Sequence, residues 1–600
     1  MINKTETLKE GYVNDYISGL KVKATPEEIE AVQVFSKQLV EDYNYPKDHI
    51  QTRPQFKVKA RPSDVKKEYP VDIAVFSSNK KREDDIYIIV ECKKRNRKDG
   101  KTQLRDYLRF SKAVLGVWFN GEERVFLRKI EKSGKVEFEE IPNIPQFGQR
   151  IEDIGKFRRK DLKPTHNLKA TFKAIRNHLA ANTVGATRDE ILAQQLINII
   201  FCKIYDEKTT KLEDIVTFRA GINEKPEDVR DRILGLFEKV KKDKKDVLDK
   251  NDAITLDVNS IVYVVGELQN YRLMEAERDV IADAFEVFIG HALKGEQGQF
   301  FTPRNVVKMM VDILEPDDGD LVIDPACGSG GFLIDSLKHI WHKIDQKGKD
   351  FNWDDSEVER EKVRFASNCV MGIDKDYFLS KVAKAYMTLI GDGTGGIFCE
   401  DSLENPRNWN EKTKQKVGLG KFDVLLTNPP FGSKIPVRGE EKLKQFEFGY
   451  KWKQDKEIMN WEKGRLKDQE APQILFIERC LQLLKNGGRM AIVLPDGIYG
   501  NNQLGYVRKF IMKKARIVAI IDVPKETFMP NTGTKTSILI LQKTSQAPKD
   551  YPVFMCVAKT CGHDRRGNLK EDDDISRVFN EFKKWQKENN FTFKLNKYDE

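Results

Sequence analysis

Asn428, Pro429, Pro430 and Phe431 form a short polar and rigid group directly after an apolar run at 422–427. The exocyclic amine of a nucleobase is a poor nucleophile because its lone pair is delocalised into the ring. Two acceptors, the Asn428 side-chain oxygen and the Pro429 carbonyl, would hold the amine hydrogens and leave the lone pair able to attack. The two prolines keep the loop rigid, and Phe431 offers a face for stacking. The group predicts a site for the amine of a flipped-out adenine; the alternative is a proline turn with a packed phenylalanine.

A glycine-rich turn at 324–331 lies about a hundred residues upstream, between a predicted strand at 321–323 and a predicted helix at 332–344. Glycines let the backbone approach a ligand closely, and free amides at a helix start favour a carboxylate. S-adenosylmethionine offers a carboxylate, an ammonium, a ribose and an adenine, and Asp324 is placed to meet the ammonium. The alternative is a tight connection without a ligand. The predicted contacts are Asp324, Ala326, Gly328, Ser329, Gly330 and Gly331.

Two further acids follow strand-like runs. Asp374 ends the run that contains Gly372 and Ile373, and a carboxylate there suits two ribose hydroxyls. Asp401 follows a third strand-like run and is predicted to accept from the adenine amino group of the cofactor. For an acid at a strand end, the alternative is a helix cap.

A second group of reactive side chains lies near the N-terminus. Asp72 sits in one strand-like run, and Glu91, Cys92 and Lys93 end the next. On adjacent strands the two carboxylates, Asp72 and Glu91, and the Cys92 carbonyl can hold Mg²⁺. Lys93 can lower the pKa of a nearby water and stabilise charge on phosphorus. The alternative is a solvated strand edge.

Gln103 and Tyr107 lie four residues apart on the next predicted helix and therefore share one face. We expect them to accompany the Mg²⁺ site, with Gln103 among the catalytic residues. An acid from the first helix, Glu28 or Glu30, is a candidate to join them.

The elements that must position these groups divide the chain into four regions: 1–150, 165–295, 296–545 and 546–600. The first has a helical pattern at 27–43 followed by strand-like runs, and the second has amphipathic stretches typical of a helical domain. The third alternates buried strands with helices, which indicates a doubly wound, largely parallel sheet. Strands are expected at 71–76, 86–90, 116–119, 125–127, 321–323, 370–373, 422–426, 490–494, 517–521 and 537–541, and helices at 190–204 and 229–240.

The composition limits the class of protein. Six hundred residues are too many for one hydrophobic core. The net charge of +10 suits a phosphate-rich partner, although a merely basic surface is the alternative. The cysteines are scattered, the N-terminal sequence is unlike a signal peptide, and no apolar run is long enough to span a bilayer. These features predict a cytoplasmic protein without membrane attachment. No phosphate-binding motif of the Gly-x-x-x-x-Gly-Lys-Ser/Thr kind occurs, so no ATP motor is expected.

Over 165–545 these motifs resemble the N6-adenine DNA methyltransferases, specifically the modification subunits of type I restriction systems. Residues 428–431 resemble the adenine form of the catalytic motif, and 324–331 resemble the first cofactor motif. The resemblance implies a Rossmann-like methyltransferase sheet preceded by a helical domain. It also implies cofactor contacts from the segment Gln299, Phe300, Phe301, Thr302, Pro303 and Arg304.

Over 25–130 the Asp72, Glu91 and Lys93 spacing resembles the PD-(D/E)xK nuclease core of type I restriction subunits, and Gln103 with Tyr107 matches a motif of that subgroup. Fusion of a nuclease to a methyltransferase is similar to the type IIB and IIG restriction–modification subunits. The resemblance implies S-adenosylmethionine and Mg²⁺ as cofactors and double-stranded DNA as substrate. Residues 546–600 are too few for two recognition domains, so sequence recognition is expected from a separate specificity subunit in a hetero-oligomer, or from a part of the protein outside these 600 residues.

Three interpretations remain open from the sequence. The first is a restriction–modification subunit that methylates adenine and also cuts DNA through Mg²⁺. The second is a modification-only methyltransferase whose N-terminal domain binds DNA or a partner without cutting. The third is a non-enzymatic DNA-binding scaffold, which the predicted amine site disfavours. The basic and aromatic stretch at 433–467 predicts either contact with DNA or a surface insertion with packed rings.

Overall fold

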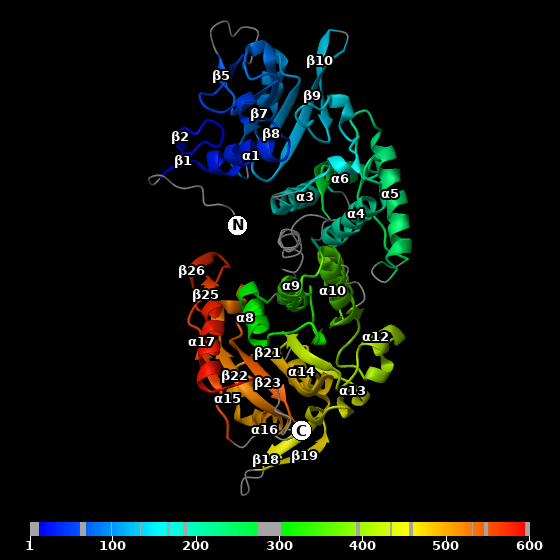
Figure 1. Cartoon of the computed structure of the whole chain (residues 1–600), viewed down its shortest axis with the longest axis vertical. Coiled ribbons are helices and arrows are strands. Elements are labelled where there is room, and N and C mark those ends of the chain that lie inside the picture. The colour runs from blue at the N-terminus through cyan, green and yellow to red at the C-terminus, as the bar shows by residue number, and fades with distance from the viewer. Residues whose placement is uncertain are drawn as a thin grey trace. The chain divides into compact units, whose positions relative to one another are not determined.

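The structure is a computed structural model of the 600-residue chain. The chain divides into two compact units, residues 1–245 with 249–291 and residues 246–248 with 292–600 (Figure 1). Each unit is described by itself. The described residues are 11–59, 68–95, 97, 99–132, 134–164, 168–183, 189–245, 248, 250–273, 302–391, 396–432, 435–454, 460–530, 532–544 and 550–593.

The first unit contains a six-stranded sheet of order β10-β9-β8-β7-β6-β3. Strands β7 and β8 are parallel, and every other pair of neighbours is antiparallel. The strands predicted in this region are confirmed as β6 to β9. The bounds are β3 Ile50–Gln51, β6 Ile73–Phe76, β7 Ile86–Cys92, β8 Leu115–Phe119, β9 Arg124–Lys132 and β10 Lys135–Ile141.

Helices cover both faces of this sheet because the strand side chains alternate between two cores. Ile73 and Val75 of β6 belong to the core that includes Phe35 of helix α1 (Gln33–Glu41). Ala74 of β6 belongs to the opposite core with Leu104 of helix α2 (Lys101–Phe110). A π-helical turn, Glu28–Val32, precedes α1, so the helix expected at 27–43 forms in two parts.

The rest of the first unit is helical, as expected from the amphipathic patterns. Its helices are α3 Leu168–Asn182, α4 Asp189–Thr209, α5 Pro226–Asp243 and α6 Val258–Leu268. Arg124 at the start of β9 forms an ion pair with Glu267 of α6, and both side chains are almost fully buried (3% and 1% exposed). This buried pair fixes the helical part of the unit against the six-stranded sheet.

The second unit contains an eight-stranded sheet of order β15-β14-β13-β16-β21-β23-β22-β24. Strand β23 runs antiparallel to both of its neighbours, and the other adjacent strands are parallel. The doubly wound, largely parallel sheet predicted from the sequence is therefore confirmed. The bounds are β13 Val322–Asp324, β14 Val370–Asp374, β15 Ile397–Cys399, β16 Phe422–Thr427, β21 Leu484–Pro495, β22 Ala515–Asp522, β23 Thr536–Lys543 and β24 Phe554–Val557.

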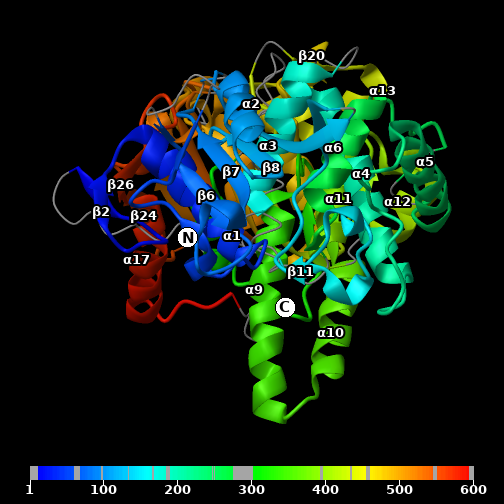
Figure 2. The same ribbon diagram turned by 90° about the horizontal axis from the view of Figure 1, so that it is seen from above.

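Helices pack on the faces of this sheet, and the carboxyl ends of its parallel strands form one edge. One face carries α14 (Pro472–Leu483) and α16 (Gly505–Lys514), whose apolar residues share a core with β16 and β21. Helix α9 (Gly331–Phe351) follows β13, and Figure 2 shows it side by side with α10 (Asp355–Asn368). The chain leaves β13 toward β14 on one side and returns to β16 on the other. Such a switch point opens a crevice at the carboxyl ends of the strands.

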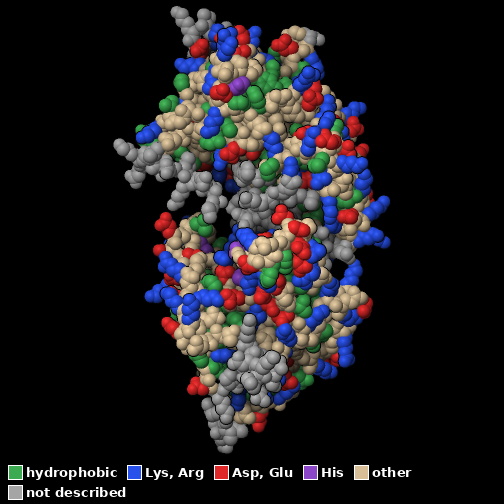
Figure 3. Space-filling model, viewed as in Figure 1, with side chains coloured by type: hydrophobic (Ala, Val, Ile, Leu, Met, Phe, Trp, Pro, Cys, Tyr) green, Lys and Arg blue, Asp and Glu red, His purple; other side chains and the backbone are tan. Residues whose placement is uncertain are grey.

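None of the described helices is long and apolar enough to cross a membrane. Lysine and arginine side chains alternate with aspartate and glutamate over the visible face (Figure 3).

Candidate active sites

The glycine turn after β13 has the geometry of a ligand cradle. Gly328 and Gly330 adopt positive φ angles of 52° and 89°, which L side chains rarely tolerate. A Cβ placed on Gly328 or Gly331 would meet no atom within 4 Å, so open space lies beside the turn. Helix α9 starts at Gly331, so its first backbone amides lie at this space, where they suit an anionic group.

Asp324 lies at the base of this turn and is only 1% exposed. Its Oδ1 accepts from the Ala326 backbone N–H at 3.0 Å. Burial, aided by the charge of Asp374, raises the pKa of Asp324 to about 7, although the hydrogen bond from Ala326 lowers it. A cationic group beside Asp324 would restore its ionised form. The ammonium of S-adenosylmethionine fits this requirement.

Asp374 ties the end of β14 to the same turn. Its Oδ2 accepts from the Gly328 N–H and its Oδ1 accepts from the Asp376 N–H, both at 2.9 Å. Burial raises the pKa of Asp374 above its usual range. The helix-cap alternative for Asp374 does not hold, because Asp376 is the acid that accepts from Leu379 N in the first turn of helix α11 (Tyr377–Gly391).

Asp401 follows β15 at the same edge of the sheet, and its carboxylate is already engaged. Oδ1 accepts from the Leu403 N–H at 2.9 Å and Oδ2 from the Lys442 ammonium at 2.7 Å. Lys442 also lies 3.2 Å from Glu404. Lys442 belongs to the basic and aromatic stretch at 433–467, and nothing in the spacing of 401 and 442 indicated this pair.

Asn428 begins the loop after β16, next to the turn carried by the neighbouring strand β13. Its Nδ2 donates to Thr302 Oγ1 at 3.1 Å. Its Oδ1 is buried and has no hydrogen-bond partner among the described residues. Buried acceptors are nearly always satisfied in folded proteins. The unsatisfied Asn428 oxygen lies beside the glycine turn and is therefore available to accept a hydrogen bond from a ligand.

The remaining residues of the motif hold the loop in place. Pro429 is buried, and the Gly432 N–H donates to Gln473 Oε1 at 3.2 Å. Phe431 is only 8% exposed, so most of its ring already contacts the protein. A stacked base would meet the small face that remains. Pro430 is partly exposed.

The segment before α8 is described in part. Gln299, Phe300 and Phe301, predicted as cofactor contacts, lie outside the described residues. Thr302 contacts the amide of Asn428, Pro303 precedes the helix, and Arg304 is the first residue of α8 (Arg304–Leu314).

The N-terminal group of acids also comes together. Register pairs Ile73 of β6 with Val90 of β7, which places Asp72 opposite Glu91. Asp72 Oδ2 accepts from the Cys92 N–H at 2.7 Å. Burial raises the pKa of Asp72 to about 6 and that of Glu91 to about 7, with the charge of Asp72 adding to the second shift.

Lys93 is the cation that faces these acids. Its Nζ donates to the Glu91 carboxylate, and it lies 3.2 Å from the Cys92 carbonyl. The oxygen atoms suited to Mg²⁺ are therefore the ones that the Lys93 ammonium now contacts. A divalent cation would stabilise the ionised forms of the two adjacent carboxylates. Within the described ranges, no set of three or more His, Cys, Asp or Glu side chains forms a metal cluster. Asp72 and Glu91 with the Cys92 carbonyl would have to share Mg²⁺ with water.

The third acid near this group is Glu27, not the expected Glu28 or Glu30. The charge of Glu27 raises the pKa of both Asp72 and Glu91, after the larger effect of burial. Glu28 instead pairs with Arg53 and accepts from Gln33, while Glu30 lies 4.0 Å from Arg95. Glu28 and Glu30 differ from the expectation because their carboxylates are engaged by these other side chains.

Gln103 and Tyr107 share one face of α2, as their spacing predicts. The Gln103 amide donates to the Tyr107 hydroxyl at 2.5 Å. Burial raises the pKa of Tyr107, and the Glu91 charge contributes to this rise. Tyr107 therefore lies close enough to Glu91 for the Glu91 charge to affect the pKa of Tyr107.

The basic and aromatic stretch is a folded insertion. Phe446 and Phe448 are buried, and the Trp452 ring stacks on Tyr506 with centroids 5.9 Å apart. The packed rings favour the insertion interpretation for the aromatic residues. The cations Lys451 and Lys453 stay exposed on β18 (Tyr450–Gln454).

Two family profiles match the chain. The profile described as N-6 DNA Methylase matches residues 276–599. The profile described as type I restriction enzyme R protein N terminus matches residues 26–145. The first match contains the glycine turn and Asn428, and the second contains Asp72, Glu91 and Lys93.

Two characterised relatives align with part of the chain. The methylase subunit of the type I restriction enzyme EcoEI from Escherichia coli is 28% identical over 271 residues, which are 44% of this chain and 47% of the relative. The type II methyltransferase M.VspI from Vibrio sp. (strain 343) is 25% identical over 334 residues, which are 55% of this chain and 66% of the relative. The alignments thus span about half to two thirds of these relatives.

A solved structure shares the fold. A chain from a study of complex assembly in the type I R-M system superposes with a TM-score of 0.50 and 17% identity. The superposition covers 71% of this chain and 85% of the solved one. At this identity the likeness concerns the fold alone.

Proposed function

The chain belongs to the N-6 DNA methylase family, and from this premise we propose that it transfers a methyl group to the N6 amine of adenine in DNA. The observation that carries the proposal is the buried, unpartnered Oδ1 of Asn428 at the carboxyl edge of the parallel strands. This acceptor and the Pro429 carbonyl would take the two hydrogens of the adenine amine. The loop is held rigid by its prolines and by the Gly432 contact, so both acceptors are in place before the base arrives.

S-adenosylmethionine would supply an electrophilic methyl group on its sulfonium. Asp324 would bind the ammonium of this cofactor, and the first amides of α9 would bind its carboxylate. Asp374 is assigned to the ribose hydroxyls, through the lone pairs that its backbone contacts leave free. Asp401 is assigned to the adenine amino group, and Lys442 holds its carboxylate in position. Thr302 orients the Asn428 amide so that its oxygen is the atom left to accept.

The test is transfer of a labelled methyl group to DNA by wild type and by Asn428→Ala. Loss of one preorganised acceptor is expected to lower the rate by about 10²- to 10³-fold. Asn368→Ala is the matched control, because Asn368 is exposed at the end of α10 that leads into β14, away from the carboxyl edge. Equal rates for wild type and Asn428→Ala would refute the proposal.

We further propose that the N-terminal sheet is a Mg²⁺-dependent DNA endonuclease centre. Support comes from the adjacent Asp72 and Glu91, the Lys93 ammonium beside them, and the profile match over 26–145. Asp72, Glu91 and the Cys92 carbonyl would hold Mg²⁺, and Lys93 would stabilise charge on the phosphorus. The second candidate function is methylation alone, with this sheet binding DNA or a partner without cutting.

Glu91→Gln separates these two functions. Wild type with Mg²⁺ is expected to cut unmethylated DNA and Glu91→Gln is not, while Glu83→Gln, a change at an exposed acid of the same unit, retains cutting. Intact DNA with wild type, in the presence of any sequence-recognising partner, would support methylation alone. The relatives named as methylase subunits of type I enzymes support a further proposal, that a separate specificity subunit joins this chain in a hetero-oligomer on double-stranded DNA.

A further inference from the structure

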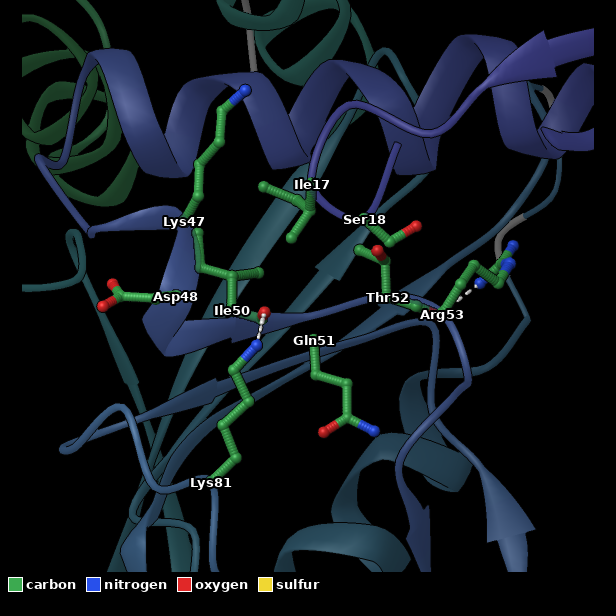
Figure 4. A pocket seen from close by; sticks show the side chains of 9 residues that line it. All are labelled: Ile17, Ser18, Lys47, Asp48, Ile50, Gln51, Thr52, Arg53 and Lys81. Atoms are coloured by element: carbon green, nitrogen blue, oxygen red, sulfur yellow. Dashed lines mark hydrogen bonds between the residues drawn. The ribbon is translucent and has the colours of Figure 1, made fainter. Parts of the chain in front are cut away.

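A cavity of about 230 Å³ lies in the first unit beside the edge strand β3 (Figure 4). It belongs to neither of the centres described above. A volume of this size is about eight times the ~30 Å³ share of one water molecule, which is enough for a phosphate group and part of a sugar. The lining residues are Ile17, Ser18, Lys47, Asp48, Ile50, Gln51, Thr52, Arg53 and Lys81.

Two of the three cations in the lining, Lys47 and Lys81, have no carboxylate partner among the described residues. Lys81 Nζ donates to the Ile50 carbonyl at 2.7 Å, and Lys47 Nζ donates to the Tyr16 carbonyl at 3.0 Å. Neither lysine forms an ion pair with a carboxylate in the part of the chain that the structure describes. Burial lowers the pKa of Lys81, and the charge of Asp48 offsets this only in part. Each ammonium has further donors for an anion, since a lysine carries three.

The cations are spread along the cavity instead of converging on one point. Figure 4 shows Arg53 at one end and Lys47 with Asp48 at the other, with Lys81 reaching β3 between them. A chain of phosphates matches cations that are spread in this way, because the nucleic-acid backbone presents negative charges at regular intervals.

The strand that lines the cavity, β3, pairs with β6, which follows Asp72 directly. Strand β3 pairs with β6 as Ile50 with Val75 and Gln51 with Ala74, and Arg53 follows two residues after this ladder ends. The Gln55 amide lies 3.4 Å from Asp72 Oδ1. A backbone that runs along the cavity past Arg53 would therefore reach the row of Asp72 and Glu91.

We propose that this cavity is a binding track for the DNA backbone, which holds phosphates next to the one presented to Asp72 and Glu91. The inference rests on the proposed action of the chain on DNA. Lys47 and Lys81 make the phosphate contacts along the track. Arg53, already paired with Glu28, marks the end at which the track meets the acids.

The test is the salt dependence of binding of the full chain to a DNA duplex without Mg²⁺. The double variant Lys47→Gln/Lys81→Gln is expected to lower the slope of log affinity against log salt by about two, near one for each lost contact. Lys21→Gln/Lys80→Gln removes the same charge from exposed lysines outside the cavity and is expected to keep the wild-type slope. The charge-conserving variant Lys47→Arg/Lys81→Arg is also expected to keep the wild-type slope. It shows whether substitution at these two positions disturbs folding without removing charge.

An unchanged slope in Lys47→Gln/Lys81→Gln, or an equal fall in both glutamine variants, overturns the proposal. So does competition by inorganic phosphate at constant ionic strength, because that result indicates a site for one small anion. DNA cutting and methyl transfer are assayed separately. A lowered slope without any cutting by wild type leaves the track in place and removes only the nuclease function.

Discussion

Thr302 tests the proposed amine site most sharply, because the resemblance and the structure assign it different roles. The resemblance places Thr302 among the cofactor contacts, whereas the structure places its Oγ1 3.1 Å from Asn428 Nδ2. In Thr302→Val the shape is nearly kept, but Asn428 Nδ2 loses this acceptor. The amide can then turn, and its oxygen no longer stays aimed at the incoming amine.

The expected magnitude follows from this one hydrogen bond. A buried donor left without a partner costs about 1–3 kcal/mol. If about 1.4–2 kcal/mol of this cost appears in the transition state, kcat falls about ten- to thirtyfold. The Kd for S-adenosylmethionine should stay unchanged, and Thr302→Ser, which keeps the hydroxyl, should restore most of the rate.

The assay is steady-state methyl transfer at saturating DNA and cofactor, with cofactor binding measured separately by calorimetry. A variant that is merely less stable would have a lower melting temperature. Thr302→Ser and Thr302→Val are therefore both compared with wild type by thermal unfolding. If Thr302→Val weakens cofactor binding about tenfold while kcat at saturation stays normal, Thr302 is a cofactor contact and the orientation argument is wrong.

Three further outcomes follow from buried charges. The pKa of Asp324, about 7, means that this carboxyl is neutral below pH 7, so cofactor affinity measured by calorimetry should weaken about tenfold from pH 8 to pH 6, and Asp324→Asn should abolish that dependence. Mg²⁺-dependent cutting should rise with pH through the pKa values of Asp72 and Glu91, about 6 and 7, because both must ionise to hold the cation; a flat profile from pH 6 to pH 8 contradicts this. Glu267→Gln leaves Arg124 buried and unpaired, which should lower the free energy of unfolding of the first unit by about 3–5 kcal/mol in urea titrations, whereas Arg124→Met/Glu267→Leu should lose much less.

The sequence predicted the elements that carry strong local patterns. Apolar runs such as 422–426 and 490–494 are buried strands because a parallel sheet covered on both faces requires continuous hydrophobic residues. The turn at 324–331 was predictable because its glycines occupy backbone conformations closed to other residues. Asp324 and Asn428 could both be identified, since each follows such a strand directly.

The contacts that decide the chemistry were not predictable in the same way. Thr302 meets Asn428 across more than a hundred residues, and Lys442 meets Asp401 across forty-one. Neither pair has a spacing rule, because both depend on where separate loops return to one edge of the sheet. Glu27 was missed because three acids, Glu27, Glu28 and Glu30, lie close together at the start of the first helix, and no pattern in the sequence decides which of them faces Asp72 and Glu91.

The two acidic centres differ in how their charge is balanced, and the difference indicates what each one binds. Asp72 and Glu91 already face the Lys93 ammonium, and burial still raises the pKa of both acids. One monovalent cation therefore leaves the charge of that pair incompletely balanced, and the Mg²⁺ of the proposed nuclease function would balance it. Among the described residues, no cationic side chain lowers the pKa of Asp324, whose carboxylate accepts from the Ala326 amide. A buried carboxyl that lacks a protein cation is matched by a ligand that brings a single positive charge of its own, as the ammonium of S-adenosylmethionine does.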